Sequence, residues 1–175
     1  MYSIIQPDRT IIKAEGERNN GNTVTVFLAG TIEMGAGVRW HAKAAERIYR
    51  TLQGKAGGAL MMPELAFYNP RRDDGFAPGM EDRQIRWEQE RLREADYVFM
   101  YLQADTKSPV SLLEFGQFIA SGRLYVACDP SFYRWRNLKV TAGFDHAADH
   151  VVDSVDECIE KVTDAMLARQ GKPES

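Results

Sequence analysis

Short runs of consecutive apolar residues alternate along this chain with stretches in which apolar residues recur every three or four positions. The run Tyr97–Leu102 is rich in aromatic and aliphatic side chains and shows no polar alternation, which is typical of a strand buried on both faces. After Ser108-Pro109 interrupts the chain, the pattern predicts a helix capped by Ser111 and ending near Ser121, followed by a second apolar run, Leu124–Cys128. This order predicts a βαβ unit, and hence parallel strands whose carboxyl ends form the ligand-binding edge of a sheet.

The rest of the chain repeats this alternation. The strands that it predicts are Val24–Ala29 and Leu60–Met62, with shorter candidates at Ser3–Gln6, Thr10–Ala14 and Leu138–Thr141, and the predicted helices are Trp40–Gln53, Asp82–Glu94 and Val152–Arg169. Residues 65–79 form a long loop, and such loops in compact domains are more often functional than plain connections. The sequence therefore predicts a doubly wound α/β sandwich over residues 23–170, preceded by an extension (1–22) and followed by a polar tail (171–175).

Composition and charge narrow the range of functions. The 175 residues suffice for one domain with a substantial core, and the net charge of -3 argues against nucleic-acid binding as the main activity. Cys128 and Cys158 lie in apolar surroundings and are expected to be buried thiols, and no metal-ligand spacing is present. Gln6, Pro7 and Asp8 interrupt the first apolar run, and no apolar stretch is long enough to span a bilayer, so we expect a soluble cytoplasmic protein without a membrane partner.

Glu88 interrupts an otherwise apolar helical face. Three apolar residues share that face at steps of three and four: Ile85, Leu92 and Ala95. A carboxylate that turns inward is costly unless it is paired or hydrogen-bonded, which makes Glu88 a candidate for catalysis. The alternative is a structural role, in which Glu88 lies at the edge of the face and reaches water, or pairs with an arginine such as Arg72.

Glu114 has two interpretations as well. Ser111-Leu-Leu-Glu114 matches the capping box, in which the glutamate bonds back to the amide of the cap residue. Yet Glu114 also lies just beyond a predicted central strand, next to Leu113 and Phe115, at a helix N-terminus that favours its ionised form. An ionised carboxylate in a dry pocket is what attack on a sugar carbon requires.

Two loops supply further polar residues. Gly30 and Thr31 end the first confident strand, but the segment AGTIEMGAG contains neither GxGxxG nor GK[ST], so it is a weak signal for a nucleotide. The loop NPRRDD contains Arg72, Asp73 and Asp74. These residues either form an exposed turn whose charges cancel, or bind sugar hydroxyls and base nitrogens through an aspartate while Arg72 orients a carboxylate or phosphate.

The segments FLAGTIEMG, NPRRDD, QIRWEQERLREADYV, SPVSLLEFG and FYRWRNL together resemble, in order and spacing, the nucleoside 2-deoxyribosyltransferase-like family over residues 24–140. The resemblance implies a flavodoxin-like α/β fold with a mainly parallel five-stranded sheet. It also implies cleavage of the N-glycosidic bond of nucleosides or nucleotides, with transfer of the sugar to another base or to water. Homo-oligomers in which neighbouring subunits complete each site are usual in the family.

The resemblance assigns roles to individual residues. The glutamate of SLLEFG is the family nucleophile, which implies this role for Glu114, and the acidic residue of QIRWE contacts the base and handles its proton, which implies this role for Glu88. Gly30 and Thr31 match the loop under the sugar. Asp73 and Asp74 match a loop at the entrance to the site.

One departure from the family pattern concerns the substrate. Transferases of the family carry an aspartate six residues before the nucleophile, and this chain has Ser108 there. A related branch hydrolyses nucleoside 5′-monophosphates and holds the phosphate with serines near this loop. Ser108 and Ser111, with the amides of the helix start, would suit a phosphate.

The hypothesis is therefore a 2-deoxyribosyl transfer through a covalent glycosyl-glutamate intermediate, without a metal or an organic cofactor. Its substrates are a nucleoside or nucleotide and a free nucleobase. The alternatives are a nucleoside 5′-monophosphate N-glycosidase, a non-catalytic nucleotide-binding module and, less favoured, an NAD glycohydrolase.

Overall fold

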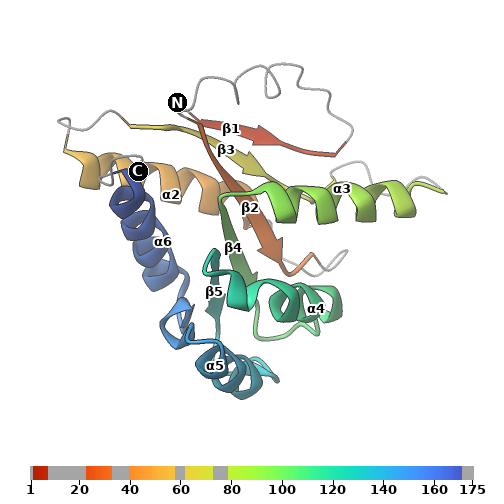
Figure 1. Ribbon diagram of the computed structural model, residues 1–175. Helices are drawn as coiled ribbons and strands as arrows, with labels where there is room; N and C mark the ends of the chain where they lie inside the picture. Colours follow the sequence, from red (N-terminus) through yellow and green to blue (C-terminus); the bar gives the residue numbers. More distant parts are fainter. Residues whose placement is uncertain (1, 8–22, 33–39, 58–61, 73–78, 171–175) are drawn as a thin grey trace.

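A parallel sheet of six strands forms the centre of the protein in the computed structural model, which describes residues 2–7, 23–32, 40–57, 62–72 and 79–170 (Figure 1). In spatial order the strands are β1 (Tyr2–Ile5), β3 (Glu64–Tyr68), β2 (Thr23–Gly30), β4 (Tyr97–Leu102), β5 (Leu124–Cys128) and β6 (Val151–Val152). Every neighbouring pair is parallel, so all the carboxyl ends lie at one edge.

Helices cover both faces of this sheet. Figure 1 shows α2 (His41–Ala56) and α6 (Val155–Gln170) side by side over one face, and α3 (Glu81–Glu94), α4 (Pro109–Phe118) and α5 (Trp135–Phe144) belong to the other. Alternate residues of the strands supply the two cores. In β2, for example, Val26 and Leu28 pack under α2 and α6, whereas Phe27 and Ala29 pack under the other three helices.

The strand order confirms the predicted flavodoxin-like topology. Without β1, the order β3-β2-β4-β5-β6 is the doubly wound order 2-1-3-4-5, whose direction reverses between β2 and β4. The sheet has six strands rather than the expected five because Tyr2–Ile5 pairs with β3 at its outer edge. Ligands of this fold class bind at the carboxyl ends of strands where the order reverses, which directs attention to the segments after β2 and β4.

One predicted strand lies at the wrong position. The second strand was expected at Leu60–Met62, but β3 begins at Glu64 and runs through residues 65–68 of the predicted loop; residues 60 and 61 are outside the described ranges. Pro63 directly precedes the strand, where its missing N–H costs no ladder hydrogen bond, so it marks a start and not an end. Four consecutive residues of β3, 65–68, are buried, as in a strand covered on both faces.

The region after β5 also differs from the prediction. Leu138–Thr141, expected to be a strand, lies inside α5, because Leu138 and Ala142 are four residues apart and both face the core. Val152, expected to begin the last helix, belongs to β6. Thr10–Ala14 lies outside the described residues. None of the helices in the described ranges combines the length and apolar composition needed to cross a membrane.

Gly30 allows the close approach of β2 and β4 at the point where the strand order reverses. Its φ is +124°, and a Cβ built on it would lie 2.1 Å from the backbone oxygen of Tyr101. We expect Gly30→Ala to lower the free energy of unfolding by about 3 kcal/mol or more, because both the strained φ and the backbone clash oppose it. Urea unfolding followed by circular dichroism measures this effect. Gly54→Ala is the matched control, since Gly54 is within α2 and nothing surrounds its added Cβ; a loss of similar size there would contradict the explanation.

Candidate functional site

Three buried hydroxyl groups meet at the carboxyl ends of β2 and β4. The Oγ1 of Thr31, which follows β2, lies 2.8 Å from the Oγ of Ser108 and 3.1 Å from the Oγ1 of Thr106. Thr106 and Ser108, both in the segment after β4, are 3.0 Å apart. The hydroxyl cluster therefore joins the two segments that border the reversal point.

Backbone contacts hold the hydroxyl cluster in place. The amide of Gln103 donates to the Oγ1 of Thr31 at 3.2 Å, and the indole N–H of Trp40 donates to the carbonyl oxygen of Thr31 at 3.1 Å. Ser108 has left-handed backbone angles (φ 44°, ψ 51°), which a residue with a side chain adopts only when its surroundings hold it there. Ser108 is only 6% exposed, and its hydroxyl group is thus part of the protein's own framework.

Glu114 lies on the buried face of α4. This helix begins at Pro109, and its N-cap is Ser108, three residues before the expected cap Ser111, with no side-chain capping bond. The predicted capping box is therefore wrong, because Glu114 is in the second turn, out of reach of the N-cap position. Glu114 and Ser111 are each only 5% exposed, and the helix dipole acts mainly within the first turn.

Glu88 lies on α3, and its helical face differs from the prediction. Ile85, expected to face inward, is 55% exposed, and the buried positions of α3 are Gln84 and Leu92, with Glu88 half-buried between them. The side-chain N–H of Gln84 donates to the Oε1 of Glu88 at 2.6 Å. Gln84 is therefore the hydrogen-bonding partner of Glu88, in place of the arginine that the structural alternative suggested.

The charge of Glu88 acts on the ionisation of Glu114. Burial raises the pKa of Glu114 to about 8, and the negative charge of Glu88 acts in the same direction. Burial also raises the pKa of Glu88, which the hydrogen bond from Gln84 partly offsets. Two acids on separate helices are thus close enough to repel, and near neutral pH the pair holds a proton that two exposed glutamates would have released.

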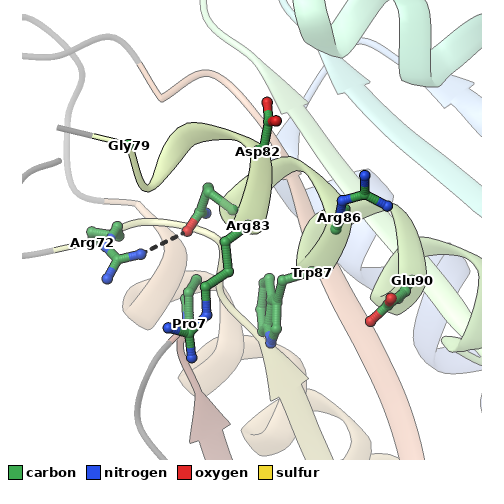
Figure 2. A pocket seen from close by; sticks show the side chains of 9 residues that line it. Pro7, Arg72, Gly79, Asp82, Arg83, Arg86, Trp87 and Glu90 are labelled. Atoms are coloured by element: carbon green, nitrogen blue, oxygen red, sulfur yellow. Dashed lines mark hydrogen bonds between the residues drawn. The ribbon is translucent and has the colours of Figure 1, made fainter. Parts of the chain in front are cut away.

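A cavity of about 520 Å³ opens beside α3 (Figure 2). Its lining includes Arg72, Arg83, Arg86, Asp82, Glu90 and Trp87. Figure 2 shows Arg83 and Trp87 extending from α3 toward Pro7, with Asp82 on the opposite side of the helix. Among the described residues, neither Glu88 nor Glu114 lines this cavity, although Gln84 reaches both the cavity and Glu88.

The remaining predicted residues have different positions. Gly30 and Thr31 lie at the carboxyl end of β2, as the resemblance implied, and Arg72 donates to the Oε1 of Gln84 at 3.2 Å. Asp73 and Asp74 lie outside the described residues. Two residues of the site, Gln84 and Thr106, were not predicted. The spacing of Gln84, four residues before Glu88 and eight before Leu92, is a signal that could have found it.

Residues 23–132, more than half of the chain, match a family model described as nucleoside 2-deoxyribosyltransferase like. Among solved structures, the crystal structure of a conserved protein from Enterococcus faecalis V583 aligns with 82% of this chain and 99% of that chain, at a TM-score of 0.48 and 18% sequence identity. A comparison with curated proteins found no match.

Proposed function

Because this chain belongs to the nucleoside 2-deoxyribosyltransferase like family, we propose that it cleaves the N-glycosidic bond of a nucleoside or nucleotide and transfers the 2-deoxyribosyl group to another base. The observation that carries the proposal is a pair of carboxyl groups shielded from water, the half-buried Glu88 on α3 and the buried Glu114 on α4, in which the charge of Glu88 raises the pKa of Glu114. Most enzymes that cleave a glycosidic bond use a pair of carboxyl groups, of which one attacks the sugar carbon and the other transfers a proton.

In the proposed reaction Glu114 is the nucleophile and Glu88 transfers the proton. The proton held by the pair passes through Glu88 to the nitrogen of the departing base. As the bond between C1′ and that nitrogen breaks, the ionised Glu114 forms an ester with C1′. A second base then attacks C1′, the ester bond breaks, and the proton of the incoming base returns to the pair. These steps use only the chain's own residues and the two substrates.

Burial of Glu114 supports this role. The transition state of glycosidic cleavage carries positive charge on the sugar, and a carboxylate stabilises that charge more strongly when water is excluded. Glu114 is 5% exposed, so it meets this condition before any substrate binds. In the free protein, burial makes the ionised form of Glu114 unfavourable. A positively charged sugar beside Glu114 removes this penalty and favours the ionised form.

The identity of residue 108, serine in place of aspartate, favours a second candidate function, hydrolysis of a nucleoside 5′-monophosphate. Ser108 stands where transferases of the family carry an aspartate that contacts the base, and its hydroxyl lies within hydrogen-bonding distance of Thr31 and Thr106. Residue 108 of this chain therefore has no carboxyl group with which to contact the nucleobase. In the hydrolase, water replaces the second base and resolves the glycosyl ester.

Exposed apolar side chains support the homo-oligomer that the resemblance implies. Val110 and Leu113 of α4 are 59% and 62% exposed, and Phe144 of α5 is 83% exposed. Large apolar side chains in water are typical of surfaces that another subunit covers. The assembly that we propose buries this part of α4, close to Glu114.

The proposed function is tested by a screen of nucleosides and their 5′-monophosphates for release of free base, measured by chromatography with and without added adenine. A transferase forms a new adenine nucleoside and releases the original base only when adenine is present. A hydrolase releases base and sugar in both conditions. Binding of a nucleotide with no base release over long incubation contradicts both and leaves the non-catalytic module.

A further inference from the structure

The side-chain amide of Gln84 lies between the acid pair and the cavity beside α3. Gln84 is 3% exposed and uses both of its N–H groups: one donates to the carbonyl oxygen of Pro70 at 2.9 Å and the other to the Oε1 of Glu88 at 2.6 Å. Its carbonyl oxygen accepts from the Nη1 of Arg72 at 3.2 Å, the bond drawn as a dashed line in Figure 2. Moving or replacing a buried glutamine with such a complete set of partners costs free energy, because its partners would lose their hydrogen bonds.

These partners permit only one orientation of the amide. If the group were rotated by half a turn, its oxygen would face two acceptor oxygens, those of Pro70 and Glu88, and its N–H groups would face the donors of Arg72. Pro70 and Arg72 therefore decide that Gln84 presents an N–H to Glu88.

The segment that carries these two partners is itself anchored. The amide of Arg71, between Pro70 and Arg72, donates to the side-chain oxygen of Asn69 at 3.0 Å, and the carbonyl of Arg71 accepts from the side chain of Gln6 at 3.0 Å. The amide of Asn69 donates to the carbonyl of Ile5 in β1. The backbone segment that hydrogen-bonds to Gln84 is thus attached to β1, at the edge of the sheet.

The environment of Glu88 gives this contact its importance. Burial opposes a negative charge on Glu88, while the N–H of Gln84 is the donor that favours it. The charge of Glu88 in turn raises the pKa of Glu114 on α4. Among the described residues, Gln84 hydrogen-bonds to one charged side chain besides Glu88, that of Arg72. Arg72 therefore acts on Glu88 through the amide of Gln84. Removing the amide would leave the carboxyl group of Glu88 free to turn and without this donor.

We propose that Gln84 is a positioning residue for the reaction: held by Pro70 and Arg72, its amide fixes the orientation of the Glu88 carboxyl group. The proposal rests on the proposed function, in which Glu88 transfers the proton to the leaving base. Gln84 does not touch substrate in this role, and it acts only through Glu88.

The test uses two substitutions in the full-length protein. Gln84→Met keeps the approximate volume and removes all three hydrogen bonds, whereas Gln84→Glu keeps an acceptor for Arg72 but removes the donor to Glu88 and adds a like charge. The matched control is Gln89→Met, since Gln89 is on the same helix but contacts Arg93 and not Glu88. The first measurement is the pKa of Glu88, from a ¹³C NMR titration with the Glu88 resonance assigned from Glu88→Gln. It needs no substrate.

We expect the pKa of Glu88 to rise by about one unit in Gln84→Met, to rise further in Gln84→Glu and to stay constant in Gln89→Met. In the base-release assay, kcat should fall by about 10- to 100-fold in both Gln84 variants, with KM little changed and the pH dependence of kcat displaced by the same amount as the pKa. If Gln84→Met loses the spectrum of the folded protein, Arg72→Met tests the orientation of the amide instead: it removes the donor to the Gln84 oxygen and should raise the pKa of Glu88 by less than Gln84→Met would, and an unchanged pKa then overturns the positioning role.

The outcomes separate this proposal from the proposed function. An unchanged pKa of Glu88 in a folded Gln84→Met protein overturns the positioning role, whatever the activity. A shifted pKa together with a loss of kcat in Gln84→Met and none in Gln89→Met supports it. A shifted pKa in a protein that releases no base even as wild type supports the control of Glu88 by Gln84, and it is the proposed function that then fails.

Discussion

Glu114→Gln is expected to lower the rate of base release by about 10⁴-fold or more while the protein stays folded. Glutamine has nearly the same shape as glutamate, but its amide cannot form the glycosyl ester. The measurement is single-turnover release of free base, followed by chromatography on the best substrate from the screen. Intact-protein mass spectrometry of quenched wild type should show the mass of one added sugar, and this adduct should be absent in Glu114→Gln.

Glu157→Gln is the control for the removal of a negative charge. Glu157 is an exposed residue of α6, over the other face of the sheet, so its substitution should leave base release within about twofold of wild type. Near-normal turnover in Glu114→Gln would remove Glu114 from the role of nucleophile, and an equal loss in both variants would point to a general effect of charge.

The same substitution is expected to stabilise the protein by about 4 kcal/mol at pH 8 and to have little effect at pH 4. The pKa of Glu114 is raised from its ordinary value of 4.5 to about 8 in the folded protein. Above pH 4.5 the unfolded chain has released this proton while the folded protein still holds it. The free energy of unfolding therefore falls as the pH rises from 4.5 toward 8. The amide that replaces the carboxyl group in Glu114→Gln does not titrate, so the variant should not show this fall.

Urea unfolding of both proteins between pH 4 and pH 9 measures this difference. Glu88→Gln is the informative companion, because loss of the neighbouring negative charge lowers the pKa of Glu114 and should end the fall in stability at a lower pH. Parallel curves for wild type and Glu114→Gln would mean that Glu114 is ionised in the folded protein. A marked destabilisation at every pH would return Glu114 to a structural role.

A gain in stability together with a loss of activity is the combination that identifies a functional acid. A buried carboxyl group kept only for structure would lower stability when it is removed, since its hydrogen bonds would be lost with it. A group retained for catalysis despite its burial costs stability, and its removal restores it. The two predictions for Glu114 therefore test the function by two independent measurements, the rate of base release and the free energy of unfolding.

Local patterns predicted the central part of the fold well. Tyr97–Leu102 and Leu124–Cys128 have the predicted bounds, because a strand buried on both faces must be apolar throughout and its ends are then visible. The prediction failed where a local signal has two meanings. Pro63 can end a strand or precede one, and here it precedes β3, while the apolar residues of α5 are too few to distinguish a helix from a strand.

The sequence predicted the two acidic residues of the site but not the residues around them. Glu88 stood out because it interrupts an apolar face, yet the inward face of α3 carries Gln84 where Ile85 was expected. Thr106 gave no signal of its own, and Gln84 gave only its helical spacing from Glu88, since an amide or a hydroxyl is common on any surface. Their importance comes from partners in other segments: Pro70 and Arg72 for Gln84, and Thr31 for Thr106.

By itself, the sequence determined the alternation of strands and helices, and with it the parallel sheet and the edge at which ligands bind, because these depend on the spacing of apolar residues along the chain. Only the tertiary structure decided that Glu88 and Glu114 repel one another, that the capping box does not form, and that Gln84 has a fixed orientation. The physical reason is that a pKa or a hydrogen bond depends on distances in space between separate elements. Here those distances are set by the packing of α3 and α4 against the same face of the sheet, close to where the strand order reverses.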